Sequence, residues 1–373
     1  MPNGCEIPFT GLTRQYNTLR EETLSTIDSV LSSGHLMNGE YTSKFEQWLA
    51  QRNHVRYAIT CHSGTQALEI IAEFSAEYTR SYRIQDTNPV ALLPSVSYVA
   101  TANALVRAGW DIHFVDVDRY GIMNFAQINH VHDYQAVVPV GLYGAAISGA
   151  GPATQWNSKI NSREGVVIED AAQHWLSDNC QRIGIASAIS FDPTKNLANY
   201  SNGGAVVTDN PDVAFYAQGW RSNNQKGNCT ATAGTNSRMS EIDCATLLIK
   251  SRYLDKWQNR RRSIASYWTD RLKDSVAVSL IDYTNQDKHS FHKFVINVDN
   301  RDQLHALLAA DGIETKVHYN KPLHELSQFH QYPGPGYLST ASALCRRVLS
   351  LPIYPELTDN EVEYIIDRVL AHV

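Results

Sequence analysis

The sequence is poor in the features that mark nucleic-acid-binding and membrane-spanning proteins. Its 373 residues carry a formal net charge of −6, and the densest basic cluster is Arg260-Arg261-Arg262. Because neutralising phosphates requires clustered Lys and Arg side chains, we expect no nucleic-acid partner. No stretch approaches the ~18 uninterrupted apolar residues of a membrane-spanning helix, so we expect no membrane partner either.

Paired cysteines are also missing. The six cysteines lie far apart, with no CxxC pair and no histidine at zinc-finger spacing, so we expect no metal site. They are most simply free thiols in a reducing compartment. The opening residues, MPNGCEIPFTG, have neither a basic region nor an apolar run of signal-peptide length. These absences favour a cytoplasmic protein.

What the sequence does contain is an ordinary globular composition, with 43% hydrophobic and 19% charged residues. The length suits one large and one small domain. Short β-branched runs alternate with helical patterns, which predicts an α/β fold with a mainly parallel sheet covered by helices on both faces. We expect a large domain over residues 1–250, with the N-terminal arm included, and a smaller C-terminal α/β domain over residues 251–373.

Periodicity and helix-breaking residues predict the individual elements. Helices are expected over Leu19–Leu31, Glu40–Arg52, Gln66–Phe74, Ala100–Ala108, Glu241–Lys273, Arg301–Ala310 and Thr358–His372. Strands are expected over Tyr57–Thr60, Val90–Leu93, Ile112–Val117, Ala136–Val140, Gly165–Ile168, Ala186–Phe191, Ala205–Thr208, Phe291–Val298 and Gly312–Val317. The Asn-, Gly- and Thr-rich stretch from Arg221 to Asn236 predicts a long loop.

The stretch from Val166 to Thr208 places an acid and a lysine after consecutive strands. Asp170 ends the first strand, where open α/β sheets bind their ligands, and Lys195 follows 25 residues later. A desolvated lysine forms Schiff bases with carbonyls, and pyridoxal phosphate enzymes add an acid that keeps the cofactor's ring nitrogen protonated. Asp170 and Lys195 have the residue types for these roles, although an isolated pair of this kind is more often a structural ion pair.

A second candidate site is the turn Ser63-Gly64-Thr65, which lies between an expected strand and an expected helix. Backbone N–H groups at a helix N-terminus, together with a glycine that permits close approach, are typical of a phosphate site. Ser and Thr also cap helices in many proteins that bind no ligand there. The turn alone therefore leaves both interpretations open.

A series of short motifs runs along nearly the whole chain. They are Gly39, Phe45-Glu46, Ser63–Leu68 (SGTQAL), Pro94–Thr101 (PSVSYVAT), Asp116–Asp118 (DVD), Glu169–Gln173 (EDAAQ), Ser190-Phe191, Lys195, Asn236–Glu241 (NSRMSE), His318–His324 (HYNKPLH) and Leu349–Leu357 (LSLPIYPEL). In this order and spacing they resemble the motifs of the DegT/StrS-type sugar aminotransferases, a branch of the fold-type I pyridoxal phosphate enzymes. The resemblance implies that fold and pyridoxal 5'-phosphate as the cofactor.

The resemblance also implies roles at the cofactor. Lys195 would carry pyridoxal phosphate as a Schiff base and move the proton between the cofactor and substrate carbons, while Asp170 would pair with the ring nitrogen. Gln173 would lie near the cofactor's phenolic oxygen, and Tyr98 would stack on its ring. On residue type alone, Tyr98 is more simply a core tyrosine.

Phosphate and partner contacts follow from the same resemblance. Ser190, Gly64 and Thr65 would form the phosphate cup. Asn236 would reach the cofactor phosphate in the site of a neighbouring subunit, and Arg238 would reach its substrate region. A site completed in this way implies a homodimer with shared active sites.

The sugar site is implied less sharply. His318, Tyr319 and His324 match the residues that line it in the family. The chain departs from the family at His174-Trp175-Leu176, where small residues are common, and at Ser201-Asn202, where many relatives carry an acid. We expect both departures to lie close to the substrate pocket, which leaves the identity of the sugar open.

The function implied is transfer of an amino group from an amino acid, L-glutamate, to a keto group of a nucleotide-linked sugar, for amino-sugar and polysaccharide biosynthesis. Amination of a keto-cyclitol is an alternative. A sugar dehydratase of the same fold carries histidine in place of the lysine, so Lys195 argues against that branch. A non-catalytic regulator would be expected to lose Lys195 or Asp170, and both are present.

Overall fold

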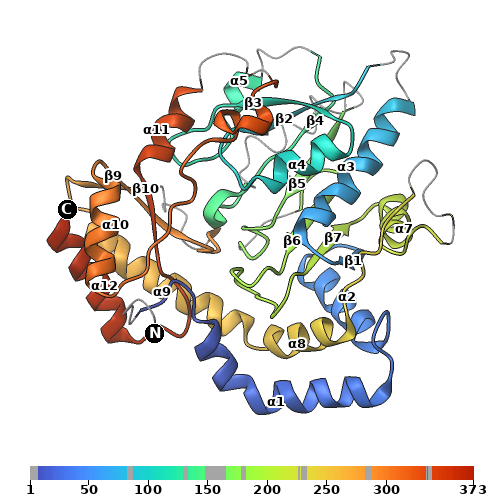
Figure 1. The fold of residues 1–373 in the computed structure, drawn as a ribbon, viewed down its shortest axis with the longest axis horizontal. Helices are drawn as coiled ribbons and strands as arrows, with labels where there is room; N and C mark the ends of the chain where they lie inside the picture. The colour runs from blue at the N-terminus through green and yellow to red at the C-terminus, as the bar shows by residue number, and fades with distance from the viewer. Residues whose placement is uncertain are drawn as a thin grey trace.

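Two β-sheets organise the chain in the computed structural model (Figure 1). The structure describes residues 7–81, 87–128, 133–147, 165–177, 182–225, 227, 233–281, 288–332, 334 and 338–373. One sheet has seven strands and the other has three. The larger sheet, with its helices, occupies the right of Figure 1, and the smaller one lies to the left, towards the C-terminus.

The seven-stranded sheet is mainly parallel. Its strands are β1 (Tyr57–Cys61), β2 (Val90–Pro94), β3 (Asp111–Val115), β4 (Ala136–Val137), β5 (Val166–Asp170), β6 (Ala186–Ser190) and β7 (Gly204–Thr208), in the order β1-β7-β6-β5-β4-β2-β3. Strand β7 runs antiparallel to β1 and β6, whereas the other neighbouring pairs are parallel. All residues of β5, β6 and β7 are buried, as expected for strands covered on both faces. The predicted mainly parallel α/β sheet is confirmed.

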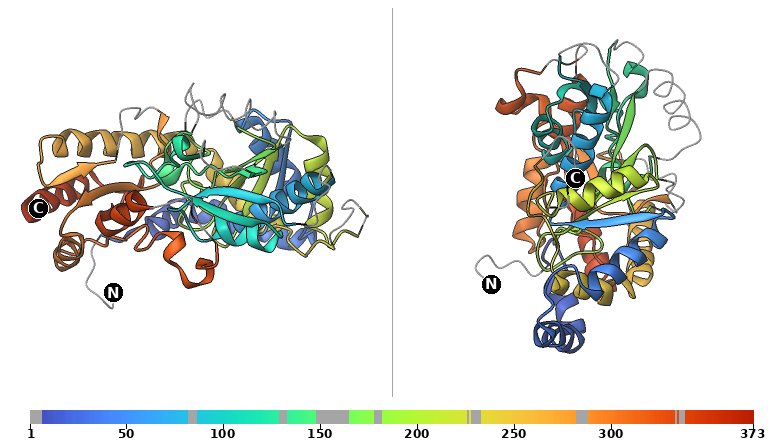
Figure 2. Two further views of the ribbon diagram at one scale, coloured as in Figure 1. Left: turned by 90° about the horizontal axis from the view of Figure 1, so that it is seen from above. Right: turned by 90° about the vertical axis from the view of Figure 1, so that its right-hand side faces the viewer.

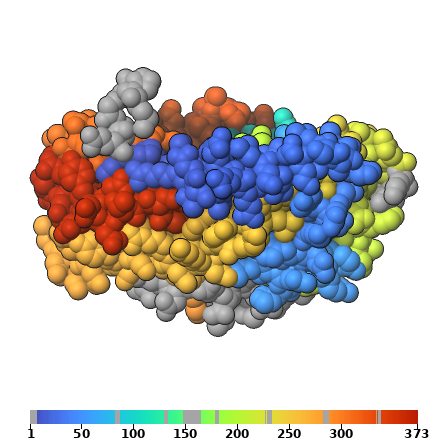
Figure 3. Space-filling view, turned by 90° about the horizontal axis from the view of Figure 1, so that it is seen from below, coloured from blue at the N-terminus to red at the C-terminus, as the bar shows by residue number. Residues whose placement is uncertain are grey.

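Helices cover both faces of this sheet (Figure 2). On one face α3 (Gly64–Ser81), α4 (Ala100–Arg107) and α7 (Pro211–Trp220) pack against the apolar strand residues. On the other face lie α2 (Glu40–Arg52) and α8 (Glu241–Ser251). The long α1 (Leu12–Ser33) contacts α8 and lies across one exposed face of the molecule in Figure 3. The short α5 (Phe125–Ile128) and η1 (Leu142–Gly144) lie in the connections.

The C-terminal layer is a second α/β unit. Its antiparallel strands, β8 (Val278–Leu280), β9 (Phe294–Val298) and β10 (Val348–Leu351), pair in the order β10-β9-β8. Its helices are α9 (Leu254–Leu272), α10 (Arg301–Ala310), α11 (Ser339–Arg347) and α12 (Asp359–His372). The short η3 (Leu323–Glu325) and η4 (Ser327–Phe329) instead pack against the core of the large sheet. Thr358 and Glu361 form a capping box that begins α12. A domain boundary at residue 250 stays a prediction.

Several predicted elements differ from the structure at their ends, and three of the differences have a clear physical reason. The strand expected over Gly312–Val317 is wrong, because Ile313 bridges to Ile7 and Lys316 bridges to Ser350, so no single partner supports a continuous ladder. The strand expected over Ala136–Val140 ends at Val137, two residues before Pro139, which has no N–H to donate. The helix expected over Glu241–Lys273 is two helices, with the break at Arg252-Tyr253.

Two further expectations can be compared with the described residues. Cys61, Cys244 and Cys345 are buried free thiols, as predicted; Cys5, Cys180 and Cys229 lie outside the described residues. None of the described helices has both the length and the apolar character needed to cross a bilayer.

Candidate active site

Asp170 ends β5 and is held in a fixed orientation. Its side chain is buried, with 5% of the residue exposed. Thr101 Oγ1 donates to Asp170 Oδ2 over 2.7 Å, and the N–H of Ala172 donates to Asp170 Oδ1 over 3.1 Å. Ser97 Oγ lies 2.8 Å from Thr101 Oγ1 and continues the network. Thr101 ends the motif Pro94–Thr101, but the sequence alone indicates no role for it.

Lys195 follows β6, the strand that runs parallel to β5. A tight turn positions it, because its N–H donates to Asp192 O over 2.8 Å. The side chain is half-buried. Burial lowers the pKa of the Lys195 ammonium, and the carboxylates of Asp170 and Asp192 oppose part of that shift. The structure therefore brings a partly desolvated amine into the field of the Asp170 carboxylate, as a carbonyl-directed nucleophile requires.

The end of β6 and the start of α3 form a cradle. Ser190 is the last residue of β6, and Gly64 is the first of α3. A Cβ on Gly64 would lie 2.6 Å from Ser190 Cβ, so only glycine allows this approach. The first-turn N–H groups of Gly64 and Thr65 have no intrahelical acceptor and lie at the positive end of α3. Ser63 Oγ accepts from Gln66 N over 3.2 Å, so the turn caps the helix as well.

Two tyrosines and a glutamine lie beside the acid. Tyr98 is 56% exposed, so the core interpretation of this tyrosine is wrong. Its ring centre lies 6.3 Å from that of Tyr319. Gln173 Nε2 donates to Tyr319 Oη over 3.4 Å. Burial raises the pKa of Tyr319 well above its ordinary value, and the nearby Asp170 carboxylate adds to this effect, so Tyr319 stays protonated.

Tyr143 connects this cluster to the C-terminal layer, although no motif in the sequence points to it. Its N–H donates to Gln173 Oε1 over 2.8 Å, and its hydroxyl donates to His318 O. Its φ of 61° is in the left-handed region, which few residues other than glycine adopt. His318 Nδ1 lies 2.8 Å from Ser350 Oγ, and burial together with nearby lysines lowers the pKa of His318 to about 3, so the imidazole is neutral at neutral pH.

The remaining predicted site residues are not joined to this cluster within the described part of the chain. His324 lies in η3 against Phe114, with 6.5 Å between ring centres, and its Nε2 is 3.8 Å from Glu325 Oε1. Asn236 is exposed, and its Oδ1 accepts from Arg238 Nη2 over 3.4 Å.

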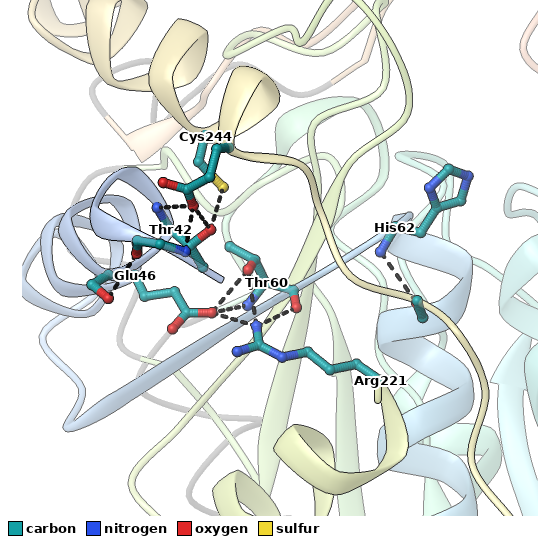
Figure 4. A network of polar contacts seen from close by, with 10 residues as sticks. Thr42, Glu46, Thr60, His62, Arg221 and Cys244 are labelled. Carbon is teal, nitrogen blue, oxygen red and sulfur yellow. Dashed lines mark hydrogen bonds and ion pairs between the residues drawn. The ribbon is translucent and has the colours of Figure 1, made fainter. Parts of the chain in front are cut away.

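A buried polar network fixes the loop that leads to Asn236 (Figure 4). Arg221 Nη1 donates to Glu46 Oε1 and, over 2.7 Å, to Thr60 O. Glu46 Oε1 also accepts from Thr60 N over 2.8 Å. At the other end of the loop, His62 N donates to Ser237 O over 2.8 Å. Both ends of the loop are therefore anchored beside the turn that precedes α3.

The first departure from the family pattern, His174-Trp175-Leu176, is buried, and its closeness to the substrate pocket stays a prediction. His174 is fully buried, with Nε2 2.9 Å from Glu169 Oε1. Trp175 and Leu176 belong to the core between the large sheet and helices α2 and α8. These larger side chains fill the core because the helix layer, rather than solvent, covers the segment after β5.

The second departure, Ser201-Asn202, is exposed. Ser201 Oγ donates to Asp243 Oδ1 over 2.7 Å, and Asn199 Nδ2 donates to the same oxygen over 2.8 Å. In this chain the carboxylate of Asp243, from α8, therefore contacts the segment before Gly203. The expected position of this segment close to the substrate pocket stays a prediction.

A model of the DegT/DnrJ/EryC1/StrS aminotransferase family matches residues 17–370. The chain belongs to this family. It is 30% identical over 375 residues to a pleiotropic regulatory protein of Geobacillus stearothermophilus, covering 97% of each chain. It is also 30% identical to dTDP-3-amino-3,4,6-trideoxy-alpha-D-glucose transaminase of Streptomyces venezuelae, covering 97% of this chain and 95% of the relative.

The fold agrees with the family. The crystal structure of a DegT DnrJ EryC1 StrS aminotransferase from Brucella abortus superposes with a TM-score of 0.88 at 28% identity, covering 98% of this chain and 100% of that one. The protein is therefore a fold-type I, pyridoxal phosphate-dependent transaminase of the DegT family.

The residues of this DegT-family protein fit the cofactor. The cradle formed by Gly64 and Ser190 leaves no room for a Cβ at position 64. This cradle lies at the positive end of α3, so it suits a phosphate. The oriented Asp170 carboxylate suits a protonated ring nitrogen, and the partly desolvated Lys195 suits an aldehyde.

Proposed function

We propose that this DegT-family transaminase transfers the amino group of L-glutamate to the keto carbon of a nucleotide-linked sugar, in amino-sugar biosynthesis. The observation that carries the proposal is the placement of Asp170 at the end of β5 and of Lys195 after the parallel neighbour β6, with the lysine partly buried in the field of the acid. The Streptomyces venezuelae relative is named for a dTDP-linked amino sugar, which supports this class of acceptor.

The proton chemistry is assigned to Lys195 and Asp170. Bound pyridoxal phosphate supplies an electron sink for the charge that develops at the substrate carbon. Lys195 would attach the cofactor, and its Nζ would remove the proton from the α carbon of the donor. The lowered pKa of Lys195 increases the fraction of free amine near neutral pH, as a base requires. Asp170, oriented by Thr101, would hold the proton on the ring nitrogen.

Other side chains would bind and orient. Ser190 Oγ and the N–H groups of Gly64 and Thr65 would hold the phosphate, which the close approach of α3 to β6 supports. Gln173 would contact the phenolic oxygen, and Tyr98 would stack on the ring. The exposed side chain of Tyr98 is free to make this contact.

For the sugar site we propose His318 and Tyr319. Tyr319 is joined to Gln173, and Tyr143 donates to the carbonyl of His318, so both residues are tied to the cluster around Asp170. A substrate role for His324 stays a prediction, because its described contacts are with Phe114 and Glu325.

We also propose a homodimer in which Asn236 and Arg238 serve the site of the partner subunit. Asn236 is exposed, and no described contact joins it to the cradle of its own chain. Apolar side chains on and after α1 are exposed, with Leu24 at 41%, Leu31 at 54% and Met37 at 39%. An exposed apolar face of this kind, on the helix seen in Figure 3, is what a subunit interface would cover.

A pair of half-reactions, followed by cofactor absorbance, tests the acceptor. L-Glutamate alone should convert the cofactor to its aminated form. Keto-sugars linked to dTDP or UDP, and a keto-cyclitol, are then added separately. Recovery of the original absorbance with a nucleotide-linked keto-sugar supports the proposal, whereas recovery with the cyclitol alone would reassign the acceptor. Lys195→Ala, which lacks the attaching amine, should show neither conversion.

A regulatory role is the second candidate, because the Geobacillus relative is named as a pleiotropic regulatory protein. The intact Lys195 and Asp170 favour a catalytic protein all the same. Conversion of the cofactor by glutamate separates the two, since a non-catalytic regulator would leave the absorbance unchanged.

We propose the cytoplasm as the place of action. The support is the set of buried free thiols Cys61, Cys244 and Cys345, which suit a reducing compartment. Fractionation of the native host with an antibody against the protein would test this.

A further inference from the structure

Lys293 is a buried lysine without an acidic partner. It lies just before β9, and 5% of the residue is exposed. Within the described part of the chain it forms no ion pair, and its Nζ instead lies 4.9 Å from the centre of the Phe9 ring. Burying a charge without a carboxylate is costly, and such costs are concentrated at functional sites.

The ammonium lies beside the proposed catalytic lysine. A small cavity of about 30 Å³ is lined by both Lys195 and Lys293, and by Arg261 and Glu356. Arg261 is occupied, because its Nη1 donates to Phe291 O over 3.2 Å and to Ile353 O over 2.6 Å. Glu356 accepts from Gln15 Nε2 over 3.2 Å. Lys293 is thus a cation of the lining that no described hydrogen bond occupies.

We propose that Lys293 binds a carboxylate of the amino-acid donor beside Lys195. The inference rests on the proposed function only in taking an amino acid as the donor. The α-carboxylate of an amino acid is bonded to the carbon that carries the reacting amino group, so its binding site must adjoin Lys195. Both lysines line one cavity, which meets this requirement.

A carboxylate fits this position better than the diphosphate of a nucleotide. Diphosphates are bound by several converging donors, and the attached nucleoside needs an open groove. Lys293 is a single point charge, enclosed by the Phe9 ring and the C-terminal layer. Lys316, whose Nζ is 5.1 Å from the same ring, has a half-exposed side chain and serves as a matched control.

The test is calorimetric titration of the holoenzyme with glutarate, a dicarboxylate that lacks the reacting amino group. Lys293→Met should weaken glutarate binding by about tenfold or more, as expected for loss of a charge-assisted contact in a dry site. Lys293→Arg, which keeps the charge, should recover most of the affinity. Lys316→Met should change the affinity by less than about threefold, since exposed charges contribute little.

Parallel titrations with UDP and dTDP test whether Lys293 binds a carboxylate or a nucleotide diphosphate. The proposal expects Lys293→Met to bind both nucleotides as the wild type does. Loss of nucleotide affinity with unchanged glutarate affinity would assign Lys293 to phosphate and overturn the proposal. Unchanged affinity for both ligands would overturn it as well.

Proton uptake gives a second readout. Burial and neighbouring cations lower the pKa of Lys293 well below its ordinary value. The charged or titratable groups that act on it are Lys195, Arg261, Lys316, Asp192, His292 and His318. A bound carboxylate would raise this pKa again, so binding should take up a fraction of a proton. Calorimetry in buffers of different ionisation enthalpy should show uptake in the wild type and in Lys316→Met, but not in Lys293→Met.

A purely structural role predicts different results. Removing an unpaired buried cation should leave the melting temperature of Lys293→Met equal to or above that of the wild type. A lower melting temperature with equal losses of glutarate and nucleotide affinity would overturn the proposal. The glutarate titration uses no keto-sugar, so its result does not depend on the acceptor. If the acceptor screen fails but glutarate binding still depends on Lys293, only the proposed acceptor is rejected.

Discussion

The hydroxyl of Thr101 donates to the carboxylate of Asp170 over 2.7 Å, and this bond joins α4 to the end of β5. Both residues are nearly completely buried, with 1% of Thr101 and 5% of Asp170 exposed. The acid assigned to the cofactor's ring nitrogen is therefore oriented from a neighbouring element as well as from its own strand.

Thr101→Val should lower kcat/KM for transamination by about ten- to a hundredfold, because loss of a hydrogen bond to a charged group costs about 1.5–3 kcal/mol when the group must stay oriented. Asp170→Asn should lower it further while retaining bound cofactor, since an amide cannot hold the ring nitrogen protonated. Steady-state kinetics with matched cofactor content measure both. Thr79→Val, in the buried part of α3, is the control; equal losses in Thr79→Val and Thr101→Val would remove the positioning role.

Gly64→Ala should weaken pyridoxal phosphate binding by more than about tenfold. The new Cβ would lie 2.6 Å from Ser190 Cβ, so α3 must move away from β6 and the cradle must widen. Equilibrium dialysis of the apoenzyme measures the affinity. Ser190→Ala, which removes one hydroxyl and keeps the spacing, should lose less. An affinity of Gly64→Ala equal to that of the wild type would contradict the cradle.

Titration of Lys250 should raise the free energy of unfolding as the pH rises from about 8 to 10.5. It is 1% exposed, donates to Ala198 O over 2.7 Å, and burial lowers its pKa from 10.5 to about 8. Between about pH 8 and 10.5 the unfolded state binds more protons than the folded state, so the free energy of unfolding rises with pH in this window. The cost of burying the charge is fully present below the folded pKa.

The measurement is denaturant-induced unfolding across that window, for the wild type and for Lys250→Met. The rise attributable to Lys250 is on the order of 3 kcal/mol, taking 1.36 kcal/mol per pKa unit. The variant should lose this part of the pH dependence. Parallel pH profiles in the two proteins would show that Lys250 does not titrate in this way.

Two inactive variants should complement each other if the active site is shared. Lys195→Ala lacks the attaching amine, and Asn236→Asp would place a carboxylate against the partner's cofactor phosphate and repel it. Mixing the two and allowing subunits to exchange would give hybrid dimers in which one site has both wild-type residues. Activity should then return to a fraction of the wild-type level. No recovery, with exchange confirmed by a mass tag, would make the assignment of Asn236 to the partner's site wrong.

The sequence determined the class of fold and the main chemistry. A buried strand has a local pattern, a short β-branched run, whichever elements pack beside it. The mainly parallel sheet was therefore predictable, and it is confirmed. The acid at the end of β5 and the lysine after β6 were predictable because both are fixed by position along the chain relative to strand ends. The family followed from the order of the motifs and is confirmed.

Only the tertiary structure decided which side chains meet. Gly312–Val317 has the composition of a strand, but its bridging residues pair with two different segments, and a ladder needs one continuous partner. Tyr98 is exposed, although its residue type favours the core, and His174 is fully buried. Exposure depends on which layer covers a segment, and the sequence does not show that layer. The contacts of Thr101 with Asp170 and of Lys293 with Phe9 join residues 69 and 284 positions apart. Such contacts depend on how whole elements pack, and no local pattern of residue types encodes that packing.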